Sequence, residues 1–309
     1  MYIVLVFQNV ISLSVNLADN IMLGAYSETS LSGVAAVNQI QFIYQQLLMA
    51  AGDGMVIFCS QYWGKKQIGP VKKIAATAMH TGLAFALILF LAVSLFPHRA
   101  VGLFTTDEAI IAEGVKYLAV IRFTYLFFAV TTILLATLRS VEIVKIAFYL
   151  SVSTLVINCC INYVLIYGRF GAPQLGVIGA AIGTLAARII ECAVAVWYVL
   201  KKEPNLKMRI SDYFHTDRIL RKDYYKTTLP MLVVQGLWGL NTAMQTAILG
   251  HMTARAIAAN SAASNLFLMV KSMAVGASSA ASVVIGKTIG EGDMSRVRLY
   301  ARRLQKMFV

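Results

Sequence analysis

The sequence is poor in charge, in proline and in cysteine. Only 13% of its 309 residues are charged, with 14 acidic residues, 5 prolines and 4 cysteines. A soluble domain has about a quarter charged residues, so the composition argues against a water-soluble protein. Cys59, Cys159, Cys160 and Cys192 show neither CxxC nor metal-ligand spacing, which disfavours zinc and redox sites. They are interpreted as small apolar packing residues.

Residue patterns for catalysis are also missing. The sequence contains no Ser/His/Asp set, no metal-ligand cluster and no Walker A loop, and its four histidines have no ligand spacing. An enzyme is therefore the least favoured class, and no cofactor is expected. The net charge of +13 does not indicate a nucleic-acid partner, because aromatic residues do not alternate with the basic ones.

Apolar sequence is what the chain has in abundance. It is 59% hydrophobic, with a mean hydropathy of +0.71, and about 20 apolar residues suffice to cross a bilayer as a helix. The prediction is an all-α polytopic membrane protein with about eight transmembrane helices. These are Tyr2–Leu23, Leu31–Ser60, Ile74–Phe96, Tyr117–Leu138, Ile146–Gly168, Leu175–Leu200, Thr227–Gly250 and Ile257–Ile285.

The positions of the basic residues predict the topology. Four, two, eight and six Lys/Arg residues follow the second, fourth, sixth and eighth spans, out of 27 in the chain. Positive residues mark the cytoplasmic side of a membrane protein. We therefore expect a multi-pass protein of the cell membrane whose first span runs outward and whose Lys201–Lys226 link is cytoplasmic.

The order of segments predicts two lobes. A six-helix amino-terminal lobe (residues 1–200) precedes a polar linker (201–226), and residues 227–309 begin a carboxy-terminal lobe. An offset of 226 residues lays the second lobe on the first, with Gly250 on Gly24. This pattern predicts a parallel repeat, as found in transporters. Within the first lobe, Thr105–Glu108 is typical of a capping box and predicts a short outer helix before Tyr117–Leu138.

Four stretches resemble the multidrug and toxic compound extrusion (MATE) family. They are DNIMLG (Asp19–Gly24), SQYWGKKQ (Ser60–Gln67), the run Asn158–Thr184 and IGKTIGEGD (Ile285–Asp293). The resemblance implies twelve helices in two lobes of six, of which this chain would supply the first eight, as a truncated product. It also implies a monomeric antiporter that exports organic cations, drugs or metabolites in exchange for H⁺ or Na⁺, by alternating access.

Asp19 is the residue that most needs an explanation. A carboxylate in a membrane costs about 2.5–3.5 kcal/mol, so it should face a wet pocket with polar neighbours. At 1.5 Å per residue, Asp19, Asn162 and Thr184 all lie roughly 7–12 Å below the outer ends of their spans. Asn158 is one turn deeper than Asn162 on the same face. The resemblance implies that these four residues are the coupling-ion site. The alternatives are a structural carboxylate that caps a helix and asparagines that join helices.

Other polar residues within spans predict a substrate cleft. Asn38, Gln41 and Gln45 share one helical face, which should meet a cavity or another helix. Lys271 is midway along its span and should face the cleft, where it would pair with the buried carboxylate, contact substrate or pair with another span. Trp238 stands about where, by the resemblance, one branch of the family has an acidic residue.

Three further questions stay open. Asp53 is either a second titratable site or an acidic residue near the wet inner surface, and we favour the second. A lipid-linked saccharide flippase is the alternative function, although only Lys271, Arg122 and Arg188 are available within spans to bind a pyrophosphate. A non-transporting membrane scaffold or receptor would leave the buried carboxylate without a purpose.

Overall fold

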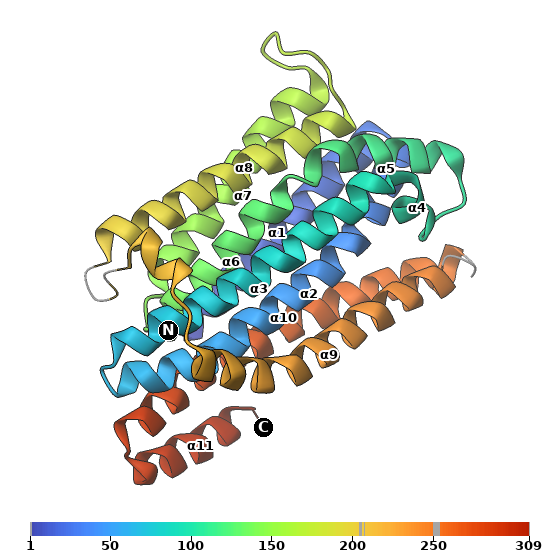
Figure 1. Cartoon of the computed structure of the whole chain (residues 1–309). Coiled ribbons are helices and arrows are strands. Elements are labelled where there is room, and N and C mark those ends of the chain that lie inside the picture. Colours follow the sequence, from blue (N-terminus) through green and yellow to red (C-terminus); the bar gives the residue numbers. More distant parts are fainter. Residues whose placement is uncertain (1, 204–205, 207, 250–253, 309) are drawn as a thin grey trace.

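The computed structural model describes residues 2–203, 206, 208–249 and 254–308, and this described part contains helices and no strand. The long helices lie side by side in a bundle, and α11 folds back from the end of α10 (Figure 1). The predicted all-α fold is confirmed. The helices are α1 (Tyr2–Tyr26), α2 (Glu28–Gly64), α3 (Ile68–Leu95), α4 (Pro97–Gly102), α5 (Glu108–Ile121), α6 (Thr124–Ser140), α7 (Lys145–Tyr167), α8 (Val177–Trp197), η1 (Tyr198–Lys202), η2 (Ile210–Phe214), α9 (Arg218–Leu249), α10 (Ala254–Glu291) and α11 (Met294–Phe308).

Five helices in the described part of the chain are long and apolar enough to cross a membrane. They belong to α2, α3, α7, α8 with η1, and α10, and the bent pair α5–α6 would make a sixth. Two of the eight predicted spans, α1 and α9, are not among them. In α9 the apolar run is interrupted by Gln235, Asn241 and Gln245. The chain is therefore a polytopic helical membrane protein.

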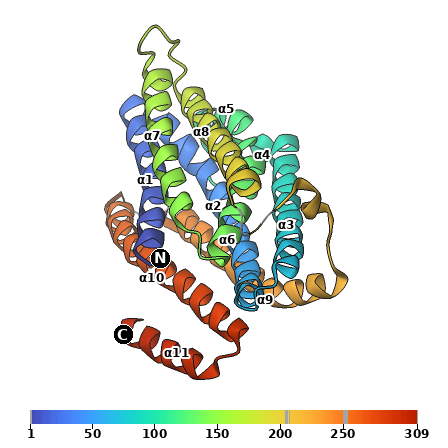
Figure 2. The same cartoon turned by 90° about the vertical axis from the view of Figure 1, so that its left-hand side faces the viewer.

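The connections between helices lie at two ends of the bundle. One end, here called the basic end, holds the α2–α3, α6–α7, α8–α9 and α10–α11 connections and most of the Lys and Arg residues of the links. The other, here called the opposite end, holds the α1–α2, α3–α5 and α7–α8 connections. Figure 2 shows the α7–α8 connection standing out at the opposite end.

The starts of the helices follow the predicted repeat offset of 226 residues. α2 begins at Glu28 and α10 at Ala254, while α3 begins at Ile68 and α11 at Met294. α2 and α10 are also nearly equal in length, with 37 and 38 residues. Gly250, on which the offset was anchored in the sequence, lies outside the described residues. The segment α10–α11 therefore has the same order and spacing as α2–α3.

α2 is the central helix of the bundle. It contacts α3, α5, α6, α9 and α10 along its length. Glycines permit this: a Cβ at Gly54 would lie 2.1 Å from the Thr228 hydroxyl oxygen of α9, and one at Gly64 would lie 2.1 Å from the Lys287 carbonyl oxygen of α10. Small residues allow helix backbones to approach closely in membranes.

The predicted outer helix is present, but its cap differs from the prediction. Asp107, rather than Thr105, is the N-cap of α5, because its carboxylate accepts hydrogen bonds from two backbone N–H groups of the first turn. The chain then bends by 55° between α5 and α6. At this bend the Thr124 hydroxyl donates to the Ile121 carbonyl at 2.6 Å. Side-chain bonds to the backbone of this kind accompany bends in helices.

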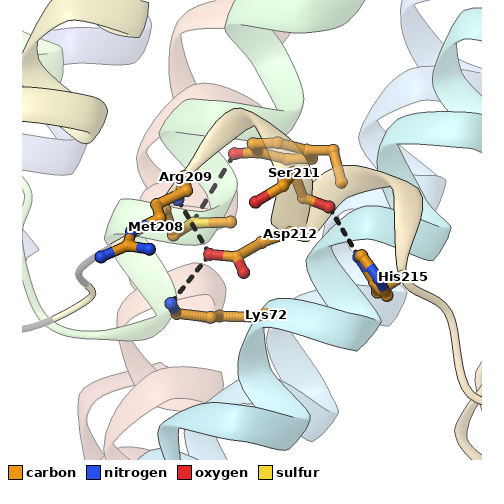
Figure 3. A network of polar contacts seen from close by, with 7 residues as sticks. Lys72, Met208, Arg209, Ser211, Asp212 and His215 are labelled. Carbon is orange, nitrogen blue, oxygen red and sulfur yellow. Dashed lines mark hydrogen bonds and ion pairs between the residues drawn. The ribbon is translucent and has the colours of Figure 1, made fainter.

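The link after α8 is shorter than the predicted 201–226 linker. η1 continues the helix to Lys202, and α9 begins at Arg218, so residues 218–226 are helical. Asp217 starts α9 early, because its carboxylate accepts hydrogen bonds from two backbone N–H groups of the first turn. Between these helices, η2 is attached to α3 by the Lys72–Asp212 ion pair at 2.8 Å (Figure 3).

Candidate functional site

Asp19 points from α1 toward α7 and α8. Asn162 Nδ2 donates to Asp19 Oδ1 at 2.5 Å, and the Thr184 hydroxyl donates to Asp19 Oδ2 at 3.4 Å. Asn158 Nδ2 donates to Thr184 Oγ1 at 3.1 Å, and Asn162 Nδ2 is also 3.3 Å from Asn158 Oδ1. The structure therefore brings the four predicted residues, from three helices, into one hydrogen-bonded cluster.

The cluster is buried within the protein. Asp19 is 6% exposed, and Asn158 and Asn162 are fully buried. In the described part of the chain, Asp19 accepts hydrogen bonds from side chains and from no backbone N–H group. It is therefore not the cap of a neighbouring helix. Its carboxylate is stabilised by an amide and a hydroxyl, which is what a negative charge needs away from water.

The cluster contains an oxygen that has no hydrogen-bond donor among the described residues, Asn162 Oδ1. A Cβ at Gly183 of α8 would lie 2.0 Å from this oxygen, so α7 and α8 approach this closely only because residue 183 is glycine. Carboxylate, amide carbonyl and hydroxyl oxygens are the ligands that hard cations prefer. A spare carbonyl oxygen beside a buried carboxylate thus suits a proton or a small hard cation.

Two residues that the sequence pattern did not indicate act on the same carboxylate. Tyr117 of α5, 3% exposed, and Arg188 of α8 both interact electrostatically with Asp19. Arg188 follows Thr184 by one helical turn, so its place on the same face was readable from the sequence. Its guanidinium is held by Glu191 at 2.7 Å. Tyr117 gave no such signal, because its approach depends on the packing of α5 against α8.

Lys271 lies against an aromatic ring rather than a carboxylate. Its Nζ is 4.0 Å from the centroid of the Trp238 ring, so the contact joins α10 to α9. This is the geometry of a cation–π interaction. An ion pair of Lys271 with Asp19 is not found among the described residues, and its contact with another span is the one with the Trp238 ring of α9.

The polar stripe of α2 lies apart from that contact. Asn38, Gln41 and Gln45 are each partly buried, and α9 packs on α2 at Ile43 and Leu47. With 3.6 residues per turn, Gln45 points away from the side of α2 that carries Ile43. The five predicted cleft residues therefore fall into two groups on different sides of α2, the stripe and the Lys271–Trp238 contact.

Asp53 is held in an ion pair in the basic-end half of α2. Its Oδ1 accepts from Arg139 at 2.7 Å, and its side chain is 34% exposed. Another nitrogen of the Arg139 guanidinium donates to Ser279 of α10 at 3.3 Å. A partly exposed, paired carboxylate agrees with our interpretation of Asp53 as an acidic residue near a wet surface.

At the basic end, α2 and α10 touch backbone to backbone. A Cβ at Gly290 would lie 2.0 Å from the Gln61 carbonyl oxygen. Nearby, Lys287 of α10 forms an ion pair with Glu142, in the turn between α6 and α7, at 2.7 Å. The basic end is therefore closed between α10 and the first six helices.

The fold and the buried carboxylate define a polytopic helical membrane protein with a candidate cation site inside its bundle. The MatE family model matches residues 5–164, about half of the chain. The chain belongs to the MatE family, which contains multidrug efflux transporters.

Curated relatives carry related names. The "Uncharacterized transporter YisQ" of Bacillus subtilis is 25% identical over 277 residues, which cover 88% of this chain and 60% of that protein. The "Probable multidrug resistance protein NorM" of Thermotoga maritima is 24% identical over 291 residues, covering 94% of this chain and 62% of that protein. The chain thus spans about 60% of the length of these relatives.

Solved structures share the fold. A MATE protein crystallised in a bent conformation superposes with a TM-score of 0.87 at 16% identity, covering 99% of this chain and 68% of that one. A MOP superfamily transporter from Pyrococcus furiosus gives a TM-score of 0.84 at 17% identity, covering 99% and 67%. At these identities the likeness establishes the fold.

Proposed function

We propose that the protein is a secondary antiporter that exports organic cations, drugs or metabolites in exchange for H⁺ or Na⁺. The observation that carries this proposal is the buried Asp19 carboxylate, with donors from α7 and α8 and the unused Asn162 oxygen beside it. In this proposal Asp19 binds the coupling ion, and Asn158, Asn162 and Thr184 supply the surrounding polar atoms.

The energy of one coupling ion is sufficient for export. A unit charge that crosses a potential of 100 mV releases about 2.3 kcal/mol. This equals a roughly 45-fold concentration gradient when the exchange moves one net charge. Transport at this scale needs no nucleotide, so the lack of a Walker A loop in the sequence fits the proposal.

The contacts of α1 suggest how ion binding reaches the rest of the molecule. α1 packs against α7, where Asn162 holds the carboxylate, and also against α10. A cation on Asp19 neutralises its charge and weakens the charge-assisted hydrogen bonds from Asn162 and Thr184. The attachment of α1 to α7 and α8 then changes, and because α1 also packs against α10, the position of α10 changes with it. Alternating access follows if α10 and α9 rock against the first six helices.

We place the basic end in the cytoplasm, because positive links mark that side of the membrane. The link after α8 then lies in the cytoplasm. We further propose that the protein is a monomer in the cell membrane. The first lobe comprises residues 1–200, and the carboxy-terminal lobe begins with α9. In this orientation the Gly290–Gln61 contact closes the cytoplasmic side, so the conformation is one that would open outward.

The substrate cleft is proposed to lie between these lobes at the Lys271–Trp238 contact, whereas the α2 stripe, on another side of α2, lies outside it. A substrate cation that stacks on the face of Trp238 covered by Lys271 must displace the Lys271 ammonium from the ring. Binding would therefore be weakest when Lys271 occupies the ring.

A flippase for lipid-linked saccharides is less well supported. Its pyrophosphate would need several cationic side chains that converge. Arg122 lies instead over the rings of Phe90 and Phe123, and Arg188 is paired with Glu191. The basic residues within the helices are thus occupied separately.

Efflux of a fluorescent organic cation from vesicles that contain the protein tests the proposal. A pH gradient and a Na⁺ gradient are imposed separately on the parent, on Asp19→Asn and on Asp53→Asn. We expect Asp19→Asn to lose gradient-driven efflux, because an amide cannot exchange a charge. Asp53→Asn is the matched control, and it should keep the ion dependence of the parent. Efflux by Asp19→Asn that responds to the same gradient as the parent removes Asp19 from the mechanism.

A further inference from the structure

An apolar groove lies on the bundle at the basic end. It has a volume of about 190 Å³ and lies between α3, α6 and α8. Its walls include Leu83, Val130, Leu134 and Val199, and the η2 residues Ile210 and Tyr213 close it toward the basic end. An apolar groove that opens from a membrane-spanning bundle faces lipid chains rather than water.

The wall that η2 forms is held in place by polar contacts. Asp212 accepts from Lys72 Nζ and from the Arg209 backbone N–H, both at 2.8 Å (Figure 3). The Tyr213 hydroxyl contacts Met208 Sδ at 3.6 Å. η2 is thus attached to α3 from one side and presents Ile210, 65% exposed, on the other.

Two basic residues are chain neighbours of groove residues. Arg209 precedes the groove residue Ile210, and Lys201 follows the groove residue Leu200. Both are exposed, and neither forms an ion pair in the described part of the chain. Lys72 forms the ion pair with Asp212, whereas Arg209 donates its backbone N–H and only adds a longer-range charge interaction.

An exposed aromatic residue completes the border. Trp197, 51% exposed, lies at the end of α8, with Lys202 Nζ 5.8 Å from its ring centroid. Tryptophan and tyrosine are enriched where a membrane protein meets the headgroups. Apolar walls, an exposed aromatic residue and exposed cations therefore occur together where α8 and η1 meet η2.

We propose that this groove binds an anionic phospholipid, with one acyl chain between α3, α6 and α8 and the phosphate group between Arg209 and Lys201. A zwitterionic lipid would fill the same apolar walls, but its headgroup lacks the net charge that the two cations attract. Each basic side chain near an anionic headgroup is worth about fivefold in affinity. The lipid site does not depend on ion coupling, so it can be tested separately from the antiporter function.

Native mass spectrometry of the purified chain tests this site. The chain is mixed with equal amounts of phosphatidylglycerol and phosphatidylcholine that carry the same acyl chains. We expect the phosphatidylglycerol complex to be more abundant, and Arg209→Ala to lower the ratio of the two complexes about fivefold. Arg218→Ala removes an exposed arginine that does not border the groove, and it should leave the ratio unchanged.

A second variant tests the acyl-chain part. Val130→Trp fills the groove and should reduce retention of both lipids, whereas Leu87→Trp, at an exposed apolar position of α3 outside the groove, should not. The proposal is overturned if Arg209→Ala and Arg218→Ala give the same ratio, or if Val130→Trp retains lipid as Leu87→Trp does. The Arg209 ratio compares two lipids on one variant, so it stays informative even if Val130→Trp fails to fold.

Discussion

Replacing Gly290 with alanine should separate α2 from α10 at the basic end. The added Cβ would lie 2.0 Å from the Gln61 carbonyl oxygen, where ordinary contacts begin at 3.4 Å. The obstacle is helix backbone, which cannot rotate away as a side chain does, so one helix must move. Overpacking of this kind costs about 1–3 kcal/mol. The cost falls only on the conformation with touching ends, so the equilibrium toward separated ends shifts by about 5- to 150-fold.

Electron–electron distance measurements can follow this change. Spin labels are placed at the exposed positions Gln67 and Ser295, in a chain whose accessible cysteines are replaced by serine. Gly102→Ala is the matched control, because its Cβ would meet only Ile111, at 3.9 Å. We expect a longer distance population in Gly290→Ala and none in Gly102→Ala. A distribution in Gly290→Ala that matches the parent would refute the backbone contact between α2 and α10.

Two further predictions concern the connections. Gly176→Ala should lower the free energy of unfolding more than Gly171→Ala in denaturant titrations. Both glycines have a positive φ, +52° and +80°, but only a Cβ at Gly176 would meet the Tyr26 ring, at 2.7 Å. Equal losses of unfolding free energy in the two variants would contradict this contact. Burial acts to raise the pKa of Asp212, but the hydrogen bonds from Lys72 and from the Arg209 backbone N–H, together with the positive charges of both side chains, outweigh it and hold that pKa below its usual value. Such a carboxylate stabilises the fold above its unfolded-state pKa of about 3.9 and loses this effect as the pH falls further. The hydrogen-exchange protection of η2, which is the intrinsic exchange rate at each pH divided by the observed rate, should therefore fall in acid. Asp212→Asn should show protection that does not change over this pH range, and parent protection that is independent of pH would contradict the ion pair.

The Asp19 cluster could be predicted because helix geometry is regular. A fixed rise per residue gives the depth of each polar residue below the end of its helix, and a fixed twist puts Asn158 and Asn162 on one face. Depth and face are local properties, so the sequence contains them. The meeting of α1, α7 and α8 at that depth then follows from the cost of leaving a carboxylate in lipid.

The features that escaped prediction depend on contacts between distant segments. Tyr117 reaches the cluster only because α5 packs on α8, and the bend before Thr124 has no proline to signal it. Lys271 forms a cation–π contact with the Trp238 ring, because α9 and α10 pack together at that position. The early start of α9 was missed for a local reason: the polar composition of residues 218–226 hid the capping role of Asp217.

Infrared difference spectroscopy on the purified protein tests most directly whether Asp19 binds the cation. Spectra are recorded on adding acid or Na⁺ to the parent, to Asp19→Asn and to Asp53→Asn. We expect a change in the stretching band of one buried carboxyl group in the parent and in Asp53→Asn, and its loss in Asp19→Asn. The same band change in Asp19→Asn would show that another group takes up the ion and would contradict the central role of Asp19.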